Sequence, residues 1–293
     1  MWLMALFTFR EAWRKKVALI AAALTLAYLI LYGAGLHFIT ADSMVYTPNP
    51  AASAASYYAM MQAITLFVLG IYLASFLVAG LAILAAAGSI AGEIENGTLY
   101  TLAVRPLSRR GLLLGKFFGL AAMLVLYAAF FFLALTGLVY WQTGLIIPGI
   151  LPALGLFILI PLVLLAVTML GTTRLSTLGN GALAFALYAI AVVGGMMEQL
   201  GALMANTTAT IYTGVITSLI LPVDAIYRRL VATVVDLLPA GNGQDISRFV
   251  NPQMTLGPFG SQSTPSDLML LYTGVYIVVL LALAVYSFKR RDI

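Results

Sequence analysis

Six long apolar runs constrain the fold of this 293-residue chain more than any other feature of its sequence. A helix that crosses a lipid bilayer needs about 20 mostly apolar residues, and each run reaches that length. The runs cover residues 17–36, 58–87, 112–140, 151–171, 177–197 and 268–288. Hydrophobic residues make up 62% of the chain and charged residues 9%, which would give a water-soluble fold far too apolar a surface. We therefore expect an all-α membrane protein whose six spans form a single transmembrane domain over residues 1–293.

The basic residues are distributed unevenly between the two sides that six spans define. An even number of spans puts both termini on one side, and twelve of the fifteen Lys and Arg residues fall on that side. Cytoplasmic loops carry an excess of Lys and Arg, so both termini are expected in the cytoplasm. The net charge of +5 therefore reports membrane orientation, and no nucleic-acid partner is expected.

Residues 1–16 have the pattern of a helix that lies in the membrane interface. Trp2, Leu6, Phe9 and Trp13 fall on one face of such a helix, next to basic residues. The same pattern also fits ordinary interface anchors of the first span, and both interpretations stay open.

Residues 198–267 are predicted to form an external segment before the last span. A seventh span within 201–223 would move the basic C-terminus outside, so this stretch is interpreted as a short re-entrant or interfacial helix. The next stretch, 223–238, predicts an amphipathic helix in which Asp224 precedes Arg228 by four residues. Its apolar face contains Ile226, Leu230, Val234 and Leu237.

A charged and turn-rich island separates the second and third runs, at residues 92–116. Glu93 and Glu95 precede a turn, and three arginines and Lys116 follow it. Glycines and Pro106 are spread along the island. These helix-breaking residues predict a short cytoplasmic helix and a break rather than an extension of the second span. Charge alone favours a solvated loop and a docking surface equally.

The order of residues in this island resembles the membrane subunit of ABC-2-type transporters. The matching residues are Glu93-Ile-Glu95-Asn-Gly97-Thr98-Leu99, Pro106-Leu107-Ser108-Arg109 and Leu114-Gly115-Lys116. In that family this region carries the coupling helix that docks into the ATP-binding subunit. The resemblance, which extends over nearly the whole chain, implies a cytoplasmic coupling segment at 89–111. The residues expected to contact the ATPase are Glu93, Glu95, Gly97, Thr98, Leu99, Arg105, Pro106, Ser108 and Arg109.

The lysine at the end of the island does not belong to a nucleotide-binding loop. Three residues separate Gly111 from Gly115, and Phe117 follows Lys116, whereas a Walker A loop needs four residues and then Ser or Thr. ATP and Mg²⁺ are therefore expected on a partner subunit, and no cofactor on this chain. Gly111, Gly115 and Gly119 fall on one helix face instead, a small-residue stripe that lets another helix approach closely.

Other function classes lack the residues that they need. The chain has no cysteine and one histidine, His37, so thiol chemistry and most zinc sites are excluded. The interiors of the six runs carry no ionisable residue, which argues against an ion-driven secondary carrier and against an integral membrane enzyme. A non-transporting assembly subunit is a weaker alternative.

The resemblance implies the remaining expectations. They are a permease subunit of ABC-2 exporter type in a prokaryotic plasma (inner) membrane, ABC ATPase subunits beneath it, a second permease chain, identical or paralogous, contact with membrane lipid and a possible external accessory protein. The run from Asp224 to Arg228 also resembles one in the copper-site-assembly permeases of nitrous oxide reductase. No residue of the sequence identifies the substrate.

Overall fold

The computed structural model describes residues 2–14, 16–41, 54–95, 97, 109–147, 149–203, 208–236 and 256–290. Every regular element in these ranges is a helix, which confirms the all-α prediction. Six helices are long and apolar enough to cross a membrane, by length and composition. They are α2 (Lys16–Ala41), α3 (Ala54–Ala87), α6 (Arg109–Thr143), α7 (Ile150–Gly171), α8 (Thr177–Leu203) and α12 (Leu268–Lys289).

Shorter helices connect and flank these six. They are α1 (Trp2–Arg14), α4 (Ala91–Glu95), α9 (Thr208–Ile220), α10 (Val223–Asp236) and the 3₁₀ turn η1 (Gly257–Phe259). The long helices differ from the predicted spans mainly at their ends. Helix α3 begins four residues before the predicted position 58, and α8 continues six residues beyond 197.

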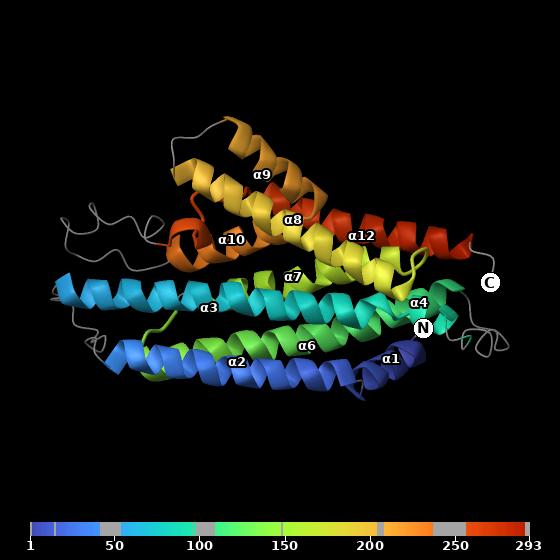
Figure 1. The fold of residues 1–293 in the computed structure, drawn as a ribbon, viewed down its shortest axis with the longest axis horizontal. Helices are drawn as coiled ribbons and strands as arrows, with labels where there is room; N and C mark the ends of the chain where they lie inside the picture. The colour runs from blue at the N-terminus through green and yellow to red at the C-terminus, as the bar shows by residue number, and fades with distance from the viewer. Residues whose placement is uncertain are drawn as a thin grey trace.

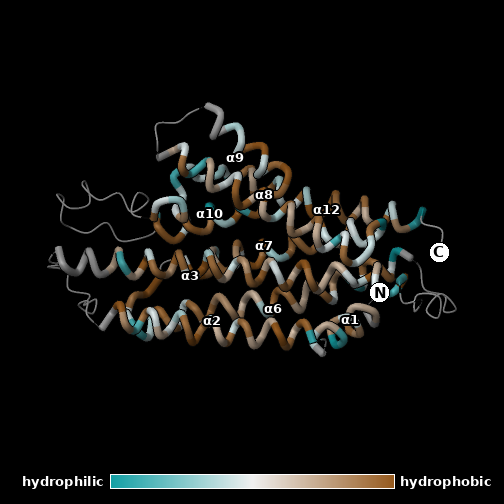
Figure 2. The backbone as a smooth tube through the Cα atoms, viewed as in Figure 1, coloured by the Kyte–Doolittle hydropathy of each residue, from teal (hydrophilic) through white to brown (hydrophobic). Residues whose placement is uncertain are grey.

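The long helices run side by side in an elongated bundle (Figure 1). Helix α1, helix α4 and the carboxyl end of α12 lie at one end of this bundle, which we call the α4 end. The carboxyl end of α2, the start of α3 and helix α10 lie toward the other end, the α10 end. Figure 2 shows hydrophobic residues along the long helices and hydrophilic residues at the α4 end and where α8, α9 and α10 meet.

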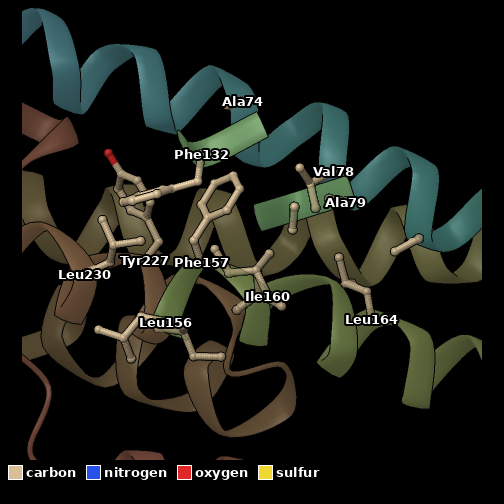
Figure 3. Packing of buried hydrophobic residues seen from close by; sticks show 14 of the residues in the cluster. Ala74, Val78, Ala79, Phe132, Leu156, Phe157, Ile160, Leu164, Tyr227 and Leu230 are labelled. Atoms are coloured by element: carbon tan, nitrogen blue, oxygen red, sulfur yellow. The ribbon is translucent and has the colours of Figure 1, made fainter. Parts of the chain in front are cut away.

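Helix α7 occupies the centre of the bundle, in contact with α3, α6, α8, α10 and α12. Its sequence contains no charged residue, so it can be surrounded by other helices without burying a charge. Figure 3 shows Phe132 of α6, Phe157 of α7 and Tyr227 of α10 converging at the core, with the first two ring centroids 5.5 Å apart. The central core is therefore built from both halves of the chain.

The stretch interpreted as re-entrant or interfacial, and the amphipathic stretch after it, form two helices joined at Leu221 and Pro222. Helix α9 packs on α8, and α10 packs on α7 and α8. The predicted apolar face of α10 is buried, with Ile226, Leu230 and Val234 each 1% exposed. Leu237 lies outside the described residues. On the polar side of α10, Asp224 and Arg228 are buried as well, whereas Arg229 and Thr233 are partly exposed and Asp236 is exposed.

Helix α1 lies against α6 at the α4 end. Thr8 and Ala12 are buried there, whereas Leu6 and Trp13 are exposed, and Phe9 stacks on Trp13 with ring centroids 6.1 Å apart. The side of α1 that faces away from the bundle is thus partly apolar, as in a helix that rests in a membrane interface.

Candidate functional site

The structure describes only part of the predicted coupling segment. Residues Ala91–Glu95 form α4, and Gly97 has a φ of 69°, in the left-handed region that glycine adopts readily. Arg109 is the first residue of α6. Outside the described residues lie Thr98, Leu99, Arg105, Pro106 and Ser108.

Glu93 pairs with Lys116, and this pair joins α4 to α6. The Lys116 Nζ lies 2.6 Å from Glu93 Oε2 and also donates to the backbone oxygen of Ser89. The lysine side chain is 5% exposed and the glutamate side chain 22%. Lys116, at the end of the island, is therefore a buried partner of the coupling segment.

Glu95 caps the amino end of α8. Its Oε1 accepts a hydrogen bond from the Thr177 backbone N–H at 2.9 Å, and its Oε2 accepts one from Thr177 Oγ1 at 2.9 Å. The first amides of a helix have no partner within the helix, and the positive end of the helix dipole favours a carboxylate there. Glu95 supplies that carboxylate from another helix, so it links α4 to α8.

Polar side chains of the α7–α8 turn hold the turn between α3 and α4. Thr172 Oγ1 donates to the backbone oxygen of Ala87 at 3.2 Å and accepts from the Ala91 N–H at 2.9 Å. Asn180 Nδ2 donates to Ala87 O at 3.4 Å and to Thr168 O at 3.0 Å. Helix α4 is consequently held on two sides, by α6 through Lys116 and by α7 and α8 through this network.

The glycine stripe of α6 meets α1 at Gly119. A β-carbon at Gly119 would lie 2.5 Å from the backbone oxygen of Ala5 and 2.7 Å from Thr8 Cβ, so only glycine permits this approach. Gly115 and Gly111 lie one and two turns nearer the amino end of the same helix.

A second group of polar residues lies near the α10 end and is centred on Arg228. Arg228 Nη1 donates to Glu198 Oε1 at 2.6 Å and to Ser263 Oγ at 2.7 Å, and Nη2 donates to Ser218 Oγ at 3.1 Å. Arg228 Nε lies 2.9 Å from Asp224 Oδ2, an ion pair without hydrogen-bond geometry. We call Glu198, Asp224 and Arg228 the buried ion cluster, since each of the three residues is at most 8% exposed.

Glycines bring α8, α9 and α10 together around this cluster. A β-carbon at Gly195 would lie 1.9 Å from Asp224 Oδ2, and one at Gly214 would lie 2.0 Å from Glu198 Oε2. Burial raises the pKa of Asp224 to about 6, although the nearby Arg228 guanidinium opposes that rise. The carboxylates are therefore held against backbone rather than in water.

Sequence reasoning missed this cluster. It placed Glu198 at the start of the external segment and Asp224 and Arg228 on an amphipathic helix, yet α8 continues past Glu198 and all three charges are buried. The i, i+4 spacing of Asp224 and Arg228 was the available signal, and that pair is present. No spacing rule pairs either residue with Glu198, which is 30 residues from Arg228.

The described residues define a polytopic α-helical membrane protein with polar junctions near both ends of its bundle. Among these residues no group of three or more His, Asp or Glu lies close enough to hold a metal ion. A family model for ABC-2 family transporter proteins matches residues 4–293. The chain therefore belongs to the ABC-2 family, as the resemblance in the island predicted, and is a permease subunit of an ABC transporter. No curated protein matches the chain.

Membership in this family makes the chain a transport component rather than a catalyst, and it implies an ATPase partner and commonly a second permease chain.

Proposed function

We propose that this chain is the membrane half of an ATP-driven exporter in a prokaryotic inner membrane, with the α4 end in the cytoplasm. Two such chains would pair around a pathway, with one ATPase beneath each. Closure of the ATPases would push on the segment around α4, and the long helices α3 and α6 would carry that motion across the membrane as rigid rods.

The observation that carries this proposal is the position of α4 between two membrane helices. Glu93 ties α4 to Lys116 of α6, and Glu95 ties it to Thr177 of α8. A displacement of α4 must therefore move both helices or break these bonds. The partly exposed Glu93 and the exposed Glu95 also leave acidic groups accessible from the α4 end.

The charge distribution supports the orientation. The basic residues of both chain ends and of the island gather on the side assigned to the cytoplasm. Since the chain has no cysteine, single cysteines can test the orientation directly. Arg110→Cys and Ser266→Cys would each place an exposed thiol, one at the start of α6 and one before α12.

In intact cells a membrane-impermeant maleimide is expected to label Ser266→Cys and to label Arg110→Cys only after the membrane is opened. The reverse pattern would overturn the assignment of the two sides.

Coupling to the ATPase is tested with the same cysteine. The full chain is purified with its ATPase, and the labelling rate of Ser266→Cys is measured with and without ATP and vanadate. We expect a nucleotide-dependent rate that disappears when Glu93→Lys and Glu95→Lys are added, while insertion and ATP hydrolysis remain. Asp267→Lys, a reversal of an exposed charge at the other end, is the control. An unchanged response in the double variant refutes the role of α4, and purification without any ATPase refutes the proposed function.

A further inference from the structure

The buried ion cluster carries one more negative charge than positive charge. Glu198 and Asp224 are carboxylates, and Arg228 is the only base that contacts them in the described parts of the chain. All three side chains are at most 9% exposed. Because an uncompensated charge in a low-dielectric interior is strongly unfavourable, the cluster needs one additional positive charge when α10 is docked.

Two carboxylate oxygens without a hydrogen-bond partner indicate where the additional positive charge would bind. Glu198 Oε1 accepts hydrogen bonds from Arg228 and from Ser263 Oγ, whereas Glu198 Oε2 is buried and has no hydrogen-bond partner. Asp224 Oδ2 is buried as well and makes only the ion pair to Arg228. Each carboxylate therefore has an oxygen that no hydrogen-bond donor stabilises, and neutralising one carboxyl with a proton would remove the surplus charge.

On the side of the α8 and α9 glycines, these oxygens have no room for further ligands of a cation. Glu198 Oε2 lies against Gly214 of α9, and the Asp224 carboxylate lies against Gly195 of α8, so closely that a single added methyl group would overlap them. A sodium ion or an ammonium group needs several oxygen ligands arranged around it. A proton does not.

Water can reach the cluster from one side. A cavity of about 180 Å³ lies between α8, α9, α10 and the segment before α12, and its lining includes Glu198, Ser218, Arg228 and Ser263. This volume holds several water molecules, and the serines and the charged groups give them partners. The cavity is a route by which a proton can exchange with the aqueous side.

We propose that the buried ion cluster is a binding site for one proton, carried by Asp224, and that the bound proton stabilises the docked position of α9 and α10 against α8. When the proton leaves, the excess negative charge loosens this contact. The inference is independent of whether an ATPase drives the protein.

The groups that face the cluster do not supply a competing charge. Helix α7 has no titratable residue, and Arg229 of α10 is engaged with Asp267 rather than with the cluster. The other titratable groups that interact electrostatically with Asp224 are tyrosines, which are ordinarily neutral near pH 6. They are Tyr72 of α3, Tyr188 of α8 and Tyr227 of α10.

The pKa of Asp224, raised by burial to about 6 from an ordinary value near 3.8, sets the pH window. A carboxyl whose pKa is higher in the folded state contributes stability that is complete below pH 4 and is lost as the pH rises through 6. In that window one extra proton on the folded state changes the folding equilibrium by up to about tenfold per pH unit.

The test is thermal unfolding of the full-length protein in detergent between pH 4.5 and 7.5. Asp224→Asn and Glu198→Gln each leave one carboxylate for one arginine. We expect the midpoint of the wild type, relative to either variant, to fall as the pH rises, so that at pH 7.5 the variants are at least as stable as the wild type. Asp267→Asn, which changes an exposed carboxylate at the same end, should keep the wild-type profile.

A second measurement identifies the bound species. Infrared spectra of the wild type at pH 5 should contain the carbonyl band of a buried carboxylic acid, and this band should disappear at pH 7.5. Parallel profiles for the wild type and both variants, or the absence of the band, would overturn the proposal. Stabilisation at constant pH by sodium or ammonium but not by choline would overturn it in favour of a cation. If neither variant folds, the infrared measurement on the wild type decides alone.

Discussion

The two ends of the bundle both contain ion pairs between helices, but they differ in charge balance and in burial. At the α4 end one base, Lys116, meets one acid, Glu93, and the acid keeps 22% of its side chain exposed. At the α10 end one base, Arg228, meets two acids, and none of the three side chains exceeds 9% exposure. The first arrangement is balanced and partly exposed, and the second is unbalanced and buried.

This difference determines how each end can change. A partly exposed carboxylate can exchange a protein partner for water or for another protein at little cost, since the solvent screens it. A buried and unbalanced cluster can change only by gaining or losing a proton or by separating the helices that enclose it. The α4 end is therefore suited to a docking contact that forms and breaks, and the α10 end to a contact that is either intact or lost.

The largest expected effect is at Arg228. Arg228→Met removes the one base of the buried ion cluster and leaves two carboxylates packed against glycines of α8 and α9. Loss of one partner from a buried ion pair costs about 3–5 kcal/mol, so the thermal midpoint in detergent should fall steeply.

The neighbouring residue is the matched control for this variant. Arg229 pairs with Asp267, which is 82% exposed, and Arg229→Met should cost less than about 1 kcal/mol. If both methionine variants melt at the same temperature, the cluster does not stabilise the α10 end.

A smaller effect is expected at Gly195. A β-carbon there would lie 1.9 Å from Asp224 Oδ2, so Gly195→Ala must displace the carboxylate from α8. Overpacking of this kind costs about 1–3 kcal/mol, which the same melting experiment measures. Gly274→Ala, in α12, is the control because no atom lies within 4 Å of its β-carbon position. Equal melting of both alanine variants would show that α8 and α10 separate easily.

The sequence predicted the six long helices and the family, and little of the contacts at the α10 end. Hydropathy gave the six long helices, because a lipid-facing helix must be apolar along its whole length. The order of residues in the island gave the family, which the match over residues 4–293 confirms. Both signals come from residues that are close together in the sequence, and such patterns can be recognised in a single sequence.

The contacts of the α10 end are not local. Glu198 meets Arg228 only because α9 and α10 fold back onto α8, which depends on Gly194, Gly195 and Gly214 lying against side chains of the neighbouring helices. Before the fold is known, such glycines cannot be distinguished from ordinary small residues in apolar helices. The same limit applies to Lys116, whose burial depends on Glu93 of another helix.

Lys116→Met is expected to have an intermediate effect, smaller than that of Arg228→Met. The variant leaves Glu93 without its base and Ser89 O without its donor, but Glu93 can turn toward water. A group left unsatisfied in this way costs about 1–3 kcal/mol. Adding Glu93→Gln should recover part of the loss, since a neutral amide tolerates the missing lysine. Failure of this rescue would indicate that Lys116 acts through packing rather than through the ion pair.

The smallest effect on global stability is expected at Glu95. This residue binds the amino end of α8, whereas Glu198 lies near the carboxyl end of the same helix. Glu95 is exposed, so Glu95→Ala should leave the thermal midpoint nearly unchanged, whereas it removes the two bonds to Thr177. The amides of the first turn of α8 then lose their cap, and their hydrogen exchange should become faster while exchange at the carboxyl end of α8 stays the same. Thr177→Val, which deletes one of the two bonds, should give a smaller acceleration at the same amides. Faster exchange along the whole of α8 would mean instead that the two ends of this helix are one cooperative unit, and that a change at α4 reaches the buried ion cluster through it.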